Sequence, residues 1–352
     1  MKAAIDLTGD KISYAYLDGN EIVTEVLQNT IGFRNSDLFR IEGAINALMR
    51  VAKDMIEFTV GDMLTEVICV LPLYVTYSQR ERVKKAAAEC GLNVRKLIIG
   101  SLASAYGIFQ NEELGQKNIL LGSVRSDYVE FLLFEVDGDV LTVTGSTMVQ
   151  YEKDPMRIDP EKLKNKIRAE LKTMYSEAGL SFGDKNEEVY LTFDGKAEFL
   201  KRLFTELLNT CFEQEPVFFE NDQEKGAFAH LLKLESEKTE LIRKCFSVDC
   251  SFEGISISSG IGGELIEVFK RNTPLPEQKV VELPVSSDNV LCFYSGNYRN
   301  RENDDPIGTC RIPSAYFGQK VIVKITLTED AIVEYVVLDA KKQIIFPRQV
   351  LK

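Results

Sequence analysis

The sequence predicts an α/β part followed by an all-β part, with the boundary near residue 245. Strands and helices alternate in a pattern that occurs twice before residue 235, and helical periodicity almost disappears after Val248. The 352 residues, 45% of them apolar, are enough to bury two ordinary cores. We therefore expect two domains, 1–245 and 246–352, the first with two similar lobes that face a cleft.

The first lobe is expected to begin with strands and to continue as a β-α-β unit. Asp18-Gly19-Asn20 is a hairpin turn signal, and apolar residues at spacings of three and four predict a helix over most of Gly43–Thr65. In the next helix, Ser78 is expected to be the N-cap, and Glu81 completes a capping box. The segments expected to be strands are Ala3–Ile5, Ile12–Leu17, Glu66–Leu71 and Lys96–Ile99.

The same order is expected again between residues 118 and 234. A helix over Pro160–Ala178 has Asp159 near its start and Gly179 at its end, which are typical cap residues. The other elements expected in this lobe are strands at 118–121, 128–136, 140–146 and 188–192 and helices at 196–210 and 222–234.

The C-terminal part is predicted to be a β-sandwich. Segments rich in Val, Ile and Phe alternate with Ser-Gly, Asp-Asn, Gly-Asn and Pro over about 105 residues, the size of one sandwich. The expected strands are 251–258, 264–271, 280–285, 289–295, 320–327 and 331–338.

Composition excludes several classes of function. The formal net charge of -12 has the wrong sign for nucleic acid or anionic membranes, and no apolar run is long enough to span a bilayer. The N-terminal residues lack the features of a signal peptide, and the seven cysteines form no C-x-x-C pair, so we expect a reduced, cytoplasmic protein. His230 is the only histidine, which argues against a His-based catalytic triad or metal centre.

Two stretches resemble one family. VLPLYVTYSQRERVKKAAAECGLNVRKLI, Val70–Ile98, is similar to a segment of the 70-kDa heat-shock chaperones, and GISISSGIGGELIEVFKRNTPLP, Gly254–Pro276, is similar to the start of their peptide-binding β-domain. The matches lie in the family's order on either side of residue 245. The resemblance implies an actin-like (ribonuclease H-like) two-lobed core followed by an all-β sandwich, in a shortened and divergent member. The sequence ends just after the last expected strands of the β-domain, so the family's helical lid is expected to be absent.

The resemblance places a nucleotide site in the first domain, but its motifs are altered. The family's first phosphate loop, D-L-G-T-T, corresponds to Asp6-Leu7-Thr8-Gly9-Asp10, and Asp10 would repel a phosphate. The remaining motifs correspond to 100–105, 122–127 and 191–196, where the family's Glu, its second acid and its glycines are replaced. By this resemblance, the small outer subdomain of the first lobe is nearly absent, and its phosphate-contacting lysine has no counterpart.

These losses predict an inactive nucleotide site. Removal of one stabilising element of this kind typically slows catalysis ~10²- to 10³-fold, so we expect a pseudo-ATPase with no cofactor. The alternative is that Asp6, Thr8, Gly9, Asp10 and Lys11, with Arg125, still bind ATP and Mg²⁺. The sequence predicts neither a catalytic residue nor a metal ligand.

The resemblance implies a peptide groove in the β-domain. Ile261 and Gly262 would lie in the loop that arches over the peptide, and Ser286 in the facing loop. The strand residues below the loops would be Leu283, Leu291 and Phe293, although Leu283 and Phe293 are as well explained as sandwich core. Without a lid, peptides are expected to bind weakly and to exchange fast.

Three classes of function follow from the sequence. The first is a chaperone-like module that binds unfolded or extended polypeptide segments through its β-domain. The second is a weak ATPase with rebuilt phosphate loops. The third is an actin-like assembly protein, for which oligomers would be expected. The β-domain motifs are better preserved than the ATP motifs, which favours the first class.

Overall fold

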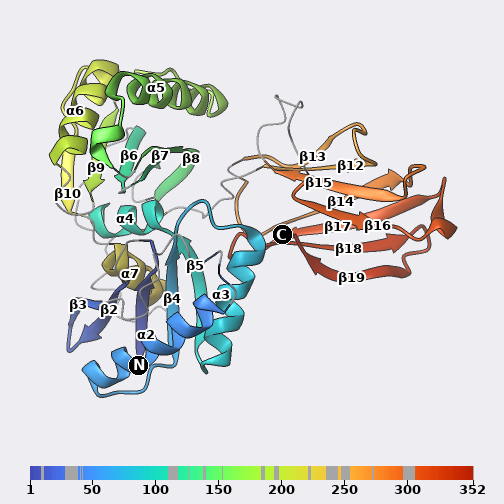
Figure 1. Ribbon diagram of the computed structural model, residues 1–352, viewed down its shortest axis with the longest axis horizontal. Helices are drawn as coiled ribbons and strands as arrows, with labels where there is room; N and C mark the ends of the chain where they lie inside the picture. Colours follow the sequence, from blue (N-terminus) through green and yellow to red (C-terminus); the bar gives the residue numbers. More distant parts are fainter. Residues whose placement is uncertain are drawn as a thin grey trace. The chain divides into compact units, whose positions relative to one another are not determined.

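The computed structural model divides into two compact units, and each is described by itself. Residues 1–75 and 83–248 form unit 1, and residues 76–82 and 249–352 form unit 2. Figure 1 shows the elements of both units along the chain. The structure describes residues 1–8, 12–27, 39, 41, 43–109, 118–125, 127–137, 140–152, 154–183, 187–193, 198–220, 223–234, 245–246, 254–271, 273–295 and 306–351.

Unit 1 is built from two mixed sheets and the helices that cover them. The elements of its first half are β1 (Lys2–Asp6), β2 (Ile12–Asp18), β3 (Glu21–Leu27), α2 (Ala44–Val60), β4 (Glu66–Leu71), α3 (Tyr77–Glu89, of which residues 83–89 belong to this unit), β5 (Asn93–Ile99) and α4 (Gly100–Phe109). The elements of its second half are β6 (Asn118–Val124), β7 (Tyr128–Asp137), β8 (Val140–Gln150), a short 3₁₀ turn (Pro155–Arg157), α5 (Pro160–Glu177), β9 (Glu188–Phe193), α6 (Glu198–Phe212), β10 (Val217–Glu220), α7 (Gln223–Leu234) and β11 (Cys245–Phe246).

The two sheets of unit 1 repeat one strand order. The first runs β3-β2-β1-β4-β5, and the second runs β8-β7-β6-β9-β10 with β11 added beside β8. In each half, the first three strands are antiparallel neighbours and the last two join them in parallel. The doubled order predicted from the sequence is therefore found, in a mixed α/β architecture.

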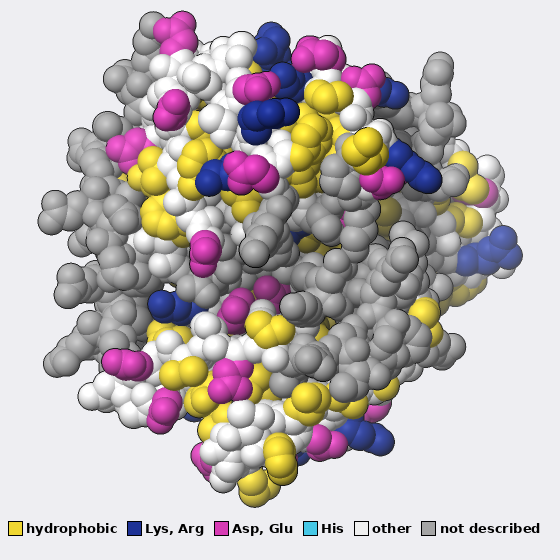
Figure 2. Space-filling view, turned by 60° about the vertical axis from the view of Figure 1, so that its left-hand side comes forward, with side chains coloured by type: hydrophobic (Ala, Val, Ile, Leu, Met, Phe, Trp, Pro, Cys, Tyr) yellow, Lys and Arg dark blue, Asp and Glu magenta, His cyan; other side chains and the backbone are white. Residues whose placement is uncertain are grey.

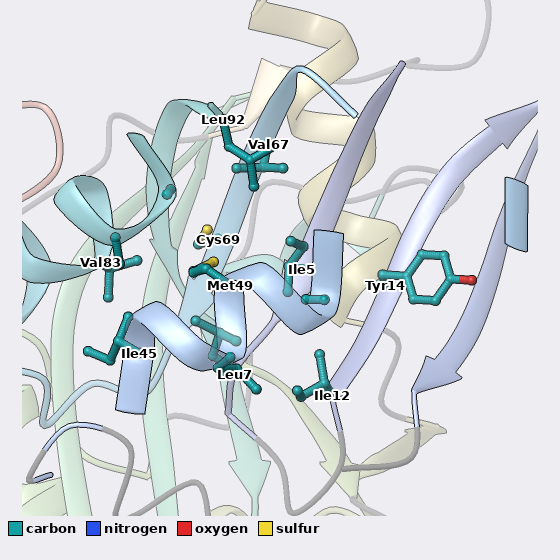
Figure 3. Close-up of a cluster of buried hydrophobic side chains, with 14 of the residues drawn as sticks. Ile5, Leu7, Ile12, Tyr14, Ile45, Met49, Val67, Cys69, Val83 and Leu92 are labelled. Atoms are coloured by element: carbon teal, nitrogen blue, oxygen red, sulfur yellow. The ribbon is translucent and has the colours of Figure 1, made fainter. Parts of the chain in front are cut away.

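Each half of unit 1 has its own apolar core. In the first half, α2 lays the buried face that contains Ile45, Leu48 and Met49 against the sheet, where Ile5 and Val67 project from β1 and β4 (Figure 3). The second half buries α5 and α6 against β6, β7 and β9 through Leu, Ile and Phe side chains. The helical spacing of three and four in the sequence produces these faces.

Helices α4 and α7 pack against each other in unit 1 at very short range. A Cβ atom added at Gly226 of α7 would lie 1.9 Å from the carbonyl oxygen of Ala103 in α4. Helix α7 follows β10 of the second sheet in sequence but packs against β1, β2 and β4 of the first, and α4 follows β5 but also contacts β6 and β7. The close packing of α4 against α7 therefore depends on the absence of a side chain at Gly226.

Two predicted caps have different outcomes. Asp159 caps α5, since its carboxylate accepts hydrogen bonds from the amides of Glu161 and Lys162. The capping box predicted at Ser78 and Glu81 is wrong, because α3 already begins at Tyr77. Thr76 and Gln79 form it instead: the Thr76 amide donates to Gln79 Oε1 at 2.9 Å, and the Gln79 amide donates to Thr76 Oγ1 at 3.4 Å.

The C-terminal residues of unit 2 form two four-stranded antiparallel sheets. Their orders are β13-β12-β15-β16 and β14-β17-β18-β19. The strands are β12 (Ile255–Ser259), β13 (Ile266–Phe269), β14 (Glu277–Pro284), β15 (Val290–Ser295), β16 (Gly308–Arg311), β17 (Lys320–Leu327), β18 (Val333–Asp339) and β19 (Ile344–Val350), with a 3₁₀ turn at Ser314–Tyr316. Both sheets contribute to one buried core, for example through Ile257 and Val323.

Four strands were not expected from the sequence, and the shortest of them is β11 with two residues. β10 and β16 have only four residues each, and β19 contains Pro347, which makes it unlike a central strand. Within the described part of the chain, no helix combines the length and apolar character needed to cross a bilayer. The cysteines described as free thiols are Cys69, Cys90, Cys211, Cys292 and Cys310.

Candidate functional site

The first predicted nucleotide loop follows β1 in unit 1. Asp6 ends β1 and is buried, and its Oδ1 accepts a hydrogen bond from the Thr8 amide at 2.7 Å. The Thr8 hydroxyl donates to Oε1 of Gln223 at 2.7 Å. Gly9, Asp10 and Lys11 lie outside the described residues, so their role stays a prediction. The described part of the loop is thus joined to the start of α7 by the hydrogen bond between Thr8 and Gln223.

Gln223 is a central residue of this site that the sequence reasoning did not single out. Its side chain is fully buried at the first position of α7. A Cβ at Gly100, the first residue of α4, would lie 2.5 Å from Gln223 Nε2, so a side chain at this position would displace the amide group. Thr8, Gly100 and Gln223 therefore meet where β1 and the starts of two helices converge. The only sequence signal was a polar residue at the start of a predicted helix.

Glu130 is the second central residue that the sequence reasoning missed. It lies in β7 and is 1% exposed, yet its Oε1 accepts a hydrogen bond from the Leu73 amide at 2.8 Å, and its Oε2 accepts one from the Ser101 amide at 3.3 Å. Burial raises the pKa of this carboxyl, while the two amides and Arg125 favour its charged form. A single acid of the second half thus binds backbone groups of the first half.

The second predicted phosphate loop is largely a strand. Gly122, Ser123 and Val124 belong to β6, which continues beyond the predicted end at Leu121, and Arg125 begins the turn into β7. A Cβ at Gly122 would lie 2.6 Å from the Leu191 side chain. Ser123 and Thr192 share a hydrogen bond of 3.0 Å. A side chain at position 122 would therefore displace the packed side chains of Leu191 and Phe131.

The two predicted loops of the groove lie together in unit 2. Ser259–Gly263 connects β12 with β13, and Ser286–Asn289 connects β14 with β15. The Ser259 hydroxyl donates to the Pro284 carbonyl and accepts from the Ser286 amide, the latter at 3.1 Å. We call these two segments the loop pair.

The predicted groove residues separate into two groups. Ile261 and Gly262 are exposed in the loop pair, Ile261 to 75%, and Ser286 is half-buried there. The strand residues are buried in the core shared by the two sheets: Leu283, Leu291 and Phe293 are 3%, 1% and 0% exposed. The structure therefore brings the loop residues together and places the strand residues beneath them in the packed core.

A surface cavity adjoins the loop pair. Its volume is about 570 Å³, and it is lined by Asp288, Asn289, Arg311, Ile312, Pro313 and Ser314. Among the residues that the structure describes, no group of three or more His, Cys, Asp or Glu side chains is arranged to hold a metal ion. On the face shown in Figure 2, basic and acidic side chains are interspersed, and apolar side chains gather in small groups between them.

The mixed α/β architecture of unit 1 is consistent with the actin-like core of the 70-kDa heat-shock chaperones, and comparison with known proteins supports a likeness to that class. The family model described as Hsp70 protein matches residues 26–149. Two ribosome-associated molecular chaperones of Saccharomyces cerevisiae are each 22% identical over 288 residues, which cover 79% of this chain and 45% of the relative. A heat shock protein of Pyricularia oryzae is 27% identical over 133 residues, 37% of this chain and 20% of that protein.

The chain is thus similar to 70-kDa heat-shock proteins, the family expected from the stretches at 70–98 and 254–276. The matched region spans less than half the length of each of the yeast relatives.

Proposed function

We propose that this protein is a chaperone-like module that binds extended polypeptide segments through the loop pair of unit 2. The observation that carries the proposal is Ile261, an apolar side chain that is 75% exposed at a fixed position above a well-packed core. An isolated exposed apolar residue needs no explanation by itself. This one stands in the segment similar to the start of the family's peptide-binding domain, and in this proposal the two sheets of unit 2 form that domain's sandwich.

Binding at this site would combine two sources of free energy. An extended peptide can form main-chain hydrogen bonds with a loop or sheet edge, and an apolar side chain buried against Ile261 would contribute up to ~2 kcal/mol. In this proposal Ser286 and Gly262 offer backbone groups to the peptide. The strand residues support the loops from the core below: Leu283, Leu291 and Phe293. For Leu283 and Phe293, a place in the core was the alternative that the sequence offered.

In the same proposal unit 1 is a scaffold whose nucleotide site is degenerate. Three contacts support this. The amides of Leu73 and Ser101 already bind the carboxylate of Glu130, Thr8 binds Gln223, and the space beside Gly122 is filled by side chains. Groups that already bind one another are poorly available to a phosphate.

The proposal is tested by Ile261→Asp with Val280→Asp as the matched control. Both residues are exposed and apolar, Val280 to 61%, but Val280 lies in β14 outside the loop pair. A fluorescein-labelled peptide with three central leucines is titrated with the full chain, and anisotropy reports binding. We expect Ile261→Asp to weaken binding at least tenfold and Val280→Asp to change it less than twofold, with the melting temperature of both variants unchanged.

The opposite results are equally informative. Equal binding by wild type and Ile261→Asp would remove the loop pair from the proposal. No binding by the wild type at any accessible concentration would end the peptide-binding function, and the assembly role would then be examined by sedimentation.

A further inference from the structure

The exposed position of Ile261 is fixed through the backbone of its loop. The Ile261 amide donates a hydrogen bond to Oδ2 of Asp288 at 3.1 Å, across the loop pair. The Gly260 amide donates to the Val290 carbonyl at 2.7 Å, and the Gly263 amide donates to the Gly260 carbonyl at 3.3 Å. Three amides of the first loop are therefore held by hydrogen bonds, whereas the side chain of Ile261 remains outside.

Asp288 is one of the residues that join the two loops, and it does so through its side chain. Its Oδ1 accepts a hydrogen bond from the Ser286 hydroxyl, while its Oδ2 accepts from Ile261. These two bonds lower the pKa of the Asp288 carboxyl below its usual value, so the side chain is charged at neutral pH. A Cβ at Gly260 would lie 3.0 Å from Asp288 Oδ1, and Gly260 has a φ of 89°, so the loop can approach this carboxylate only with glycine at that position.

We propose that Asp288 is a positioning residue: it fixes the backbone of Ile261 and thereby pre-organises the loop pair for an extended apolar polypeptide segment. The inference rests on the proposed function and adds how the site is prepared. A loop that is ordered before binding loses less conformational entropy when the peptide binds. The contribution of Asp288 is therefore made through Ile261.

The variants Asp288→Ala and Asp288→Asn separate this role from a simple charge effect. Alanine removes both acceptors, whereas asparagine keeps one oxygen that can accept the Ile261 amide. Glu329→Ala is the control, since Glu329 is another acid of unit 2, in the turn between β17 and β18. With the same labelled leucine peptide and the full chain, we expect Asp288→Ala to weaken binding about tenfold, as for the loss of one or two hydrogen bonds. Asp288→Asn should lose less, and Glu329→Ala less than twofold.

A double-mutant cycle tests whether Asp288 acts through Ile261. In the Ile261→Ser background, where the apolar anchor is already lost, Asp288→Ala should weaken binding less than twofold further. A second labelled peptide, with lysines flanking the leucines, should give the same ratios. Full additivity of the two substitutions, or an effect seen only with the lysine peptide, would overturn the positioning role in favour of direct charge recognition.

Amide hydrogen exchange gives a readout that is independent of peptide binding. The Ile261 amide should exchange severalfold faster in Asp288→Ala than in wild type, and Asp288→Asn should restore part of the protection. Unchanged exchange at Ile261 would overturn the inference and leave the proposed function intact. If exchange responds as expected but the wild type binds neither peptide, the proposed function fails, and the inference fails with it.

Discussion

The polar residues of the two candidate sites have opposite effects. In unit 1 they bind one another across the site: Thr8 binds Gln223, and Glu130 binds amides that follow β4 and begin α4. In unit 2, Asp288 binds the backbone of the facing loop and leaves the apolar side chain of Ile261 in solvent. In unit 1 the hydrogen bonds occupy the polar groups of the candidate site, whereas in unit 2 they hold a loop with its apolar side chain exposed. We therefore expect ligand binding in unit 2 rather than in unit 1.

The largest expected effect comes from Phe293→Asp, which tests whether the loop pair depends on the core below it. Phe293 is fully buried, with its ring centroid 4.5 Å from that of Tyr335. A charge buried there should lower the free energy of unfolding by about 4 kcal/mol or more. Urea unfolding followed by circular dichroism measures this. Ile261→Asp in the same assay should cost less than about 0.5 kcal/mol, and a similar loss in both would contradict the contrast between core and loop.

Gly226→Ala should disrupt the packing of α7 against α4 in unit 1. Alanine normally stabilises the interior of a helix by about 1 kcal/mol relative to glycine. Here the new methyl group would overlap the Ala103 carbonyl, so we expect a loss of about 2 kcal/mol or more. The exposed neighbour Lys225→Ala is the control and should change the melting temperature little. Stabilisation by Gly226→Ala would show that α4 and α7 do not pack as closely as described.

Glu130→Gln should change how stability depends on pH. Burial raises the pKa of Glu130 above its ordinary value of 4.5, so between that value and the raised one the folded chain binds more protons than the unfolded chain. The wild type therefore loses stability from this group as pH rises through that window. Glutamine does not ionise, so the melting temperature of the variant relative to wild type should increase with pH.

Two results would contradict this view of Glu130. A constant difference between variant and wild type from about pH 4 to pH 8 would mean that the folded pKa is not raised. If the melting temperature of the variant relative to wild type decreased with pH, the two amide hydrogen bonds would outweigh burial, and the folded protein would favour the charged carboxylate.

The smallest expected effect is that of nucleotide. ATP or ADP with Mg²⁺ should bind no tighter than about millimolar and should leave the melting temperature nearly unchanged, because the amides and glycine space at the site are already occupied. Titration calorimetry on the full chain measures this. Binding with a micromolar dissociation constant would stabilise the fold by several kcal/mol at millimolar ligand. It would show that the candidate site of unit 1 can accept a nucleotide.

Much of the fold could be predicted because its signals are local. Apolar spacing in α2, the buried run of β4 and the cap at Asp159 each depend on a few neighbouring residues. The capping box of α3 was misplaced because two overlapping patterns, Thr76 with Gln79 and Ser78 with Glu81, both fit the rule. The turn at Pro72–Val75, which sets the start of the helix, decides between them.

The candidate sites were harder to predict because their contacts are distant in sequence. Gln223 meets Thr8 and Gly100 only after both halves of unit 1 have folded, and Glu130 looks like one more residue of an alternating strand. Ile261 and Gly262 could be singled out because a family resemblance marks their loop. Asp288 could not be, since its importance lies in one bond to a backbone amide across the loop pair.

The exchange of helices within unit 1 has a consequence for how this unit folds. Helix α7 belongs by sequence to the second half but covers β1, β2 and β4, while α4 belongs to the first half and reaches β6 and β7 (Figure 1). A helix of each half thus packs against the sheet of the other half. Parts that depend on each other unfold cooperatively, so the two halves should melt in a single transition. A chain cut between residues 109 and 118 should regain its structure only when both fragments are present.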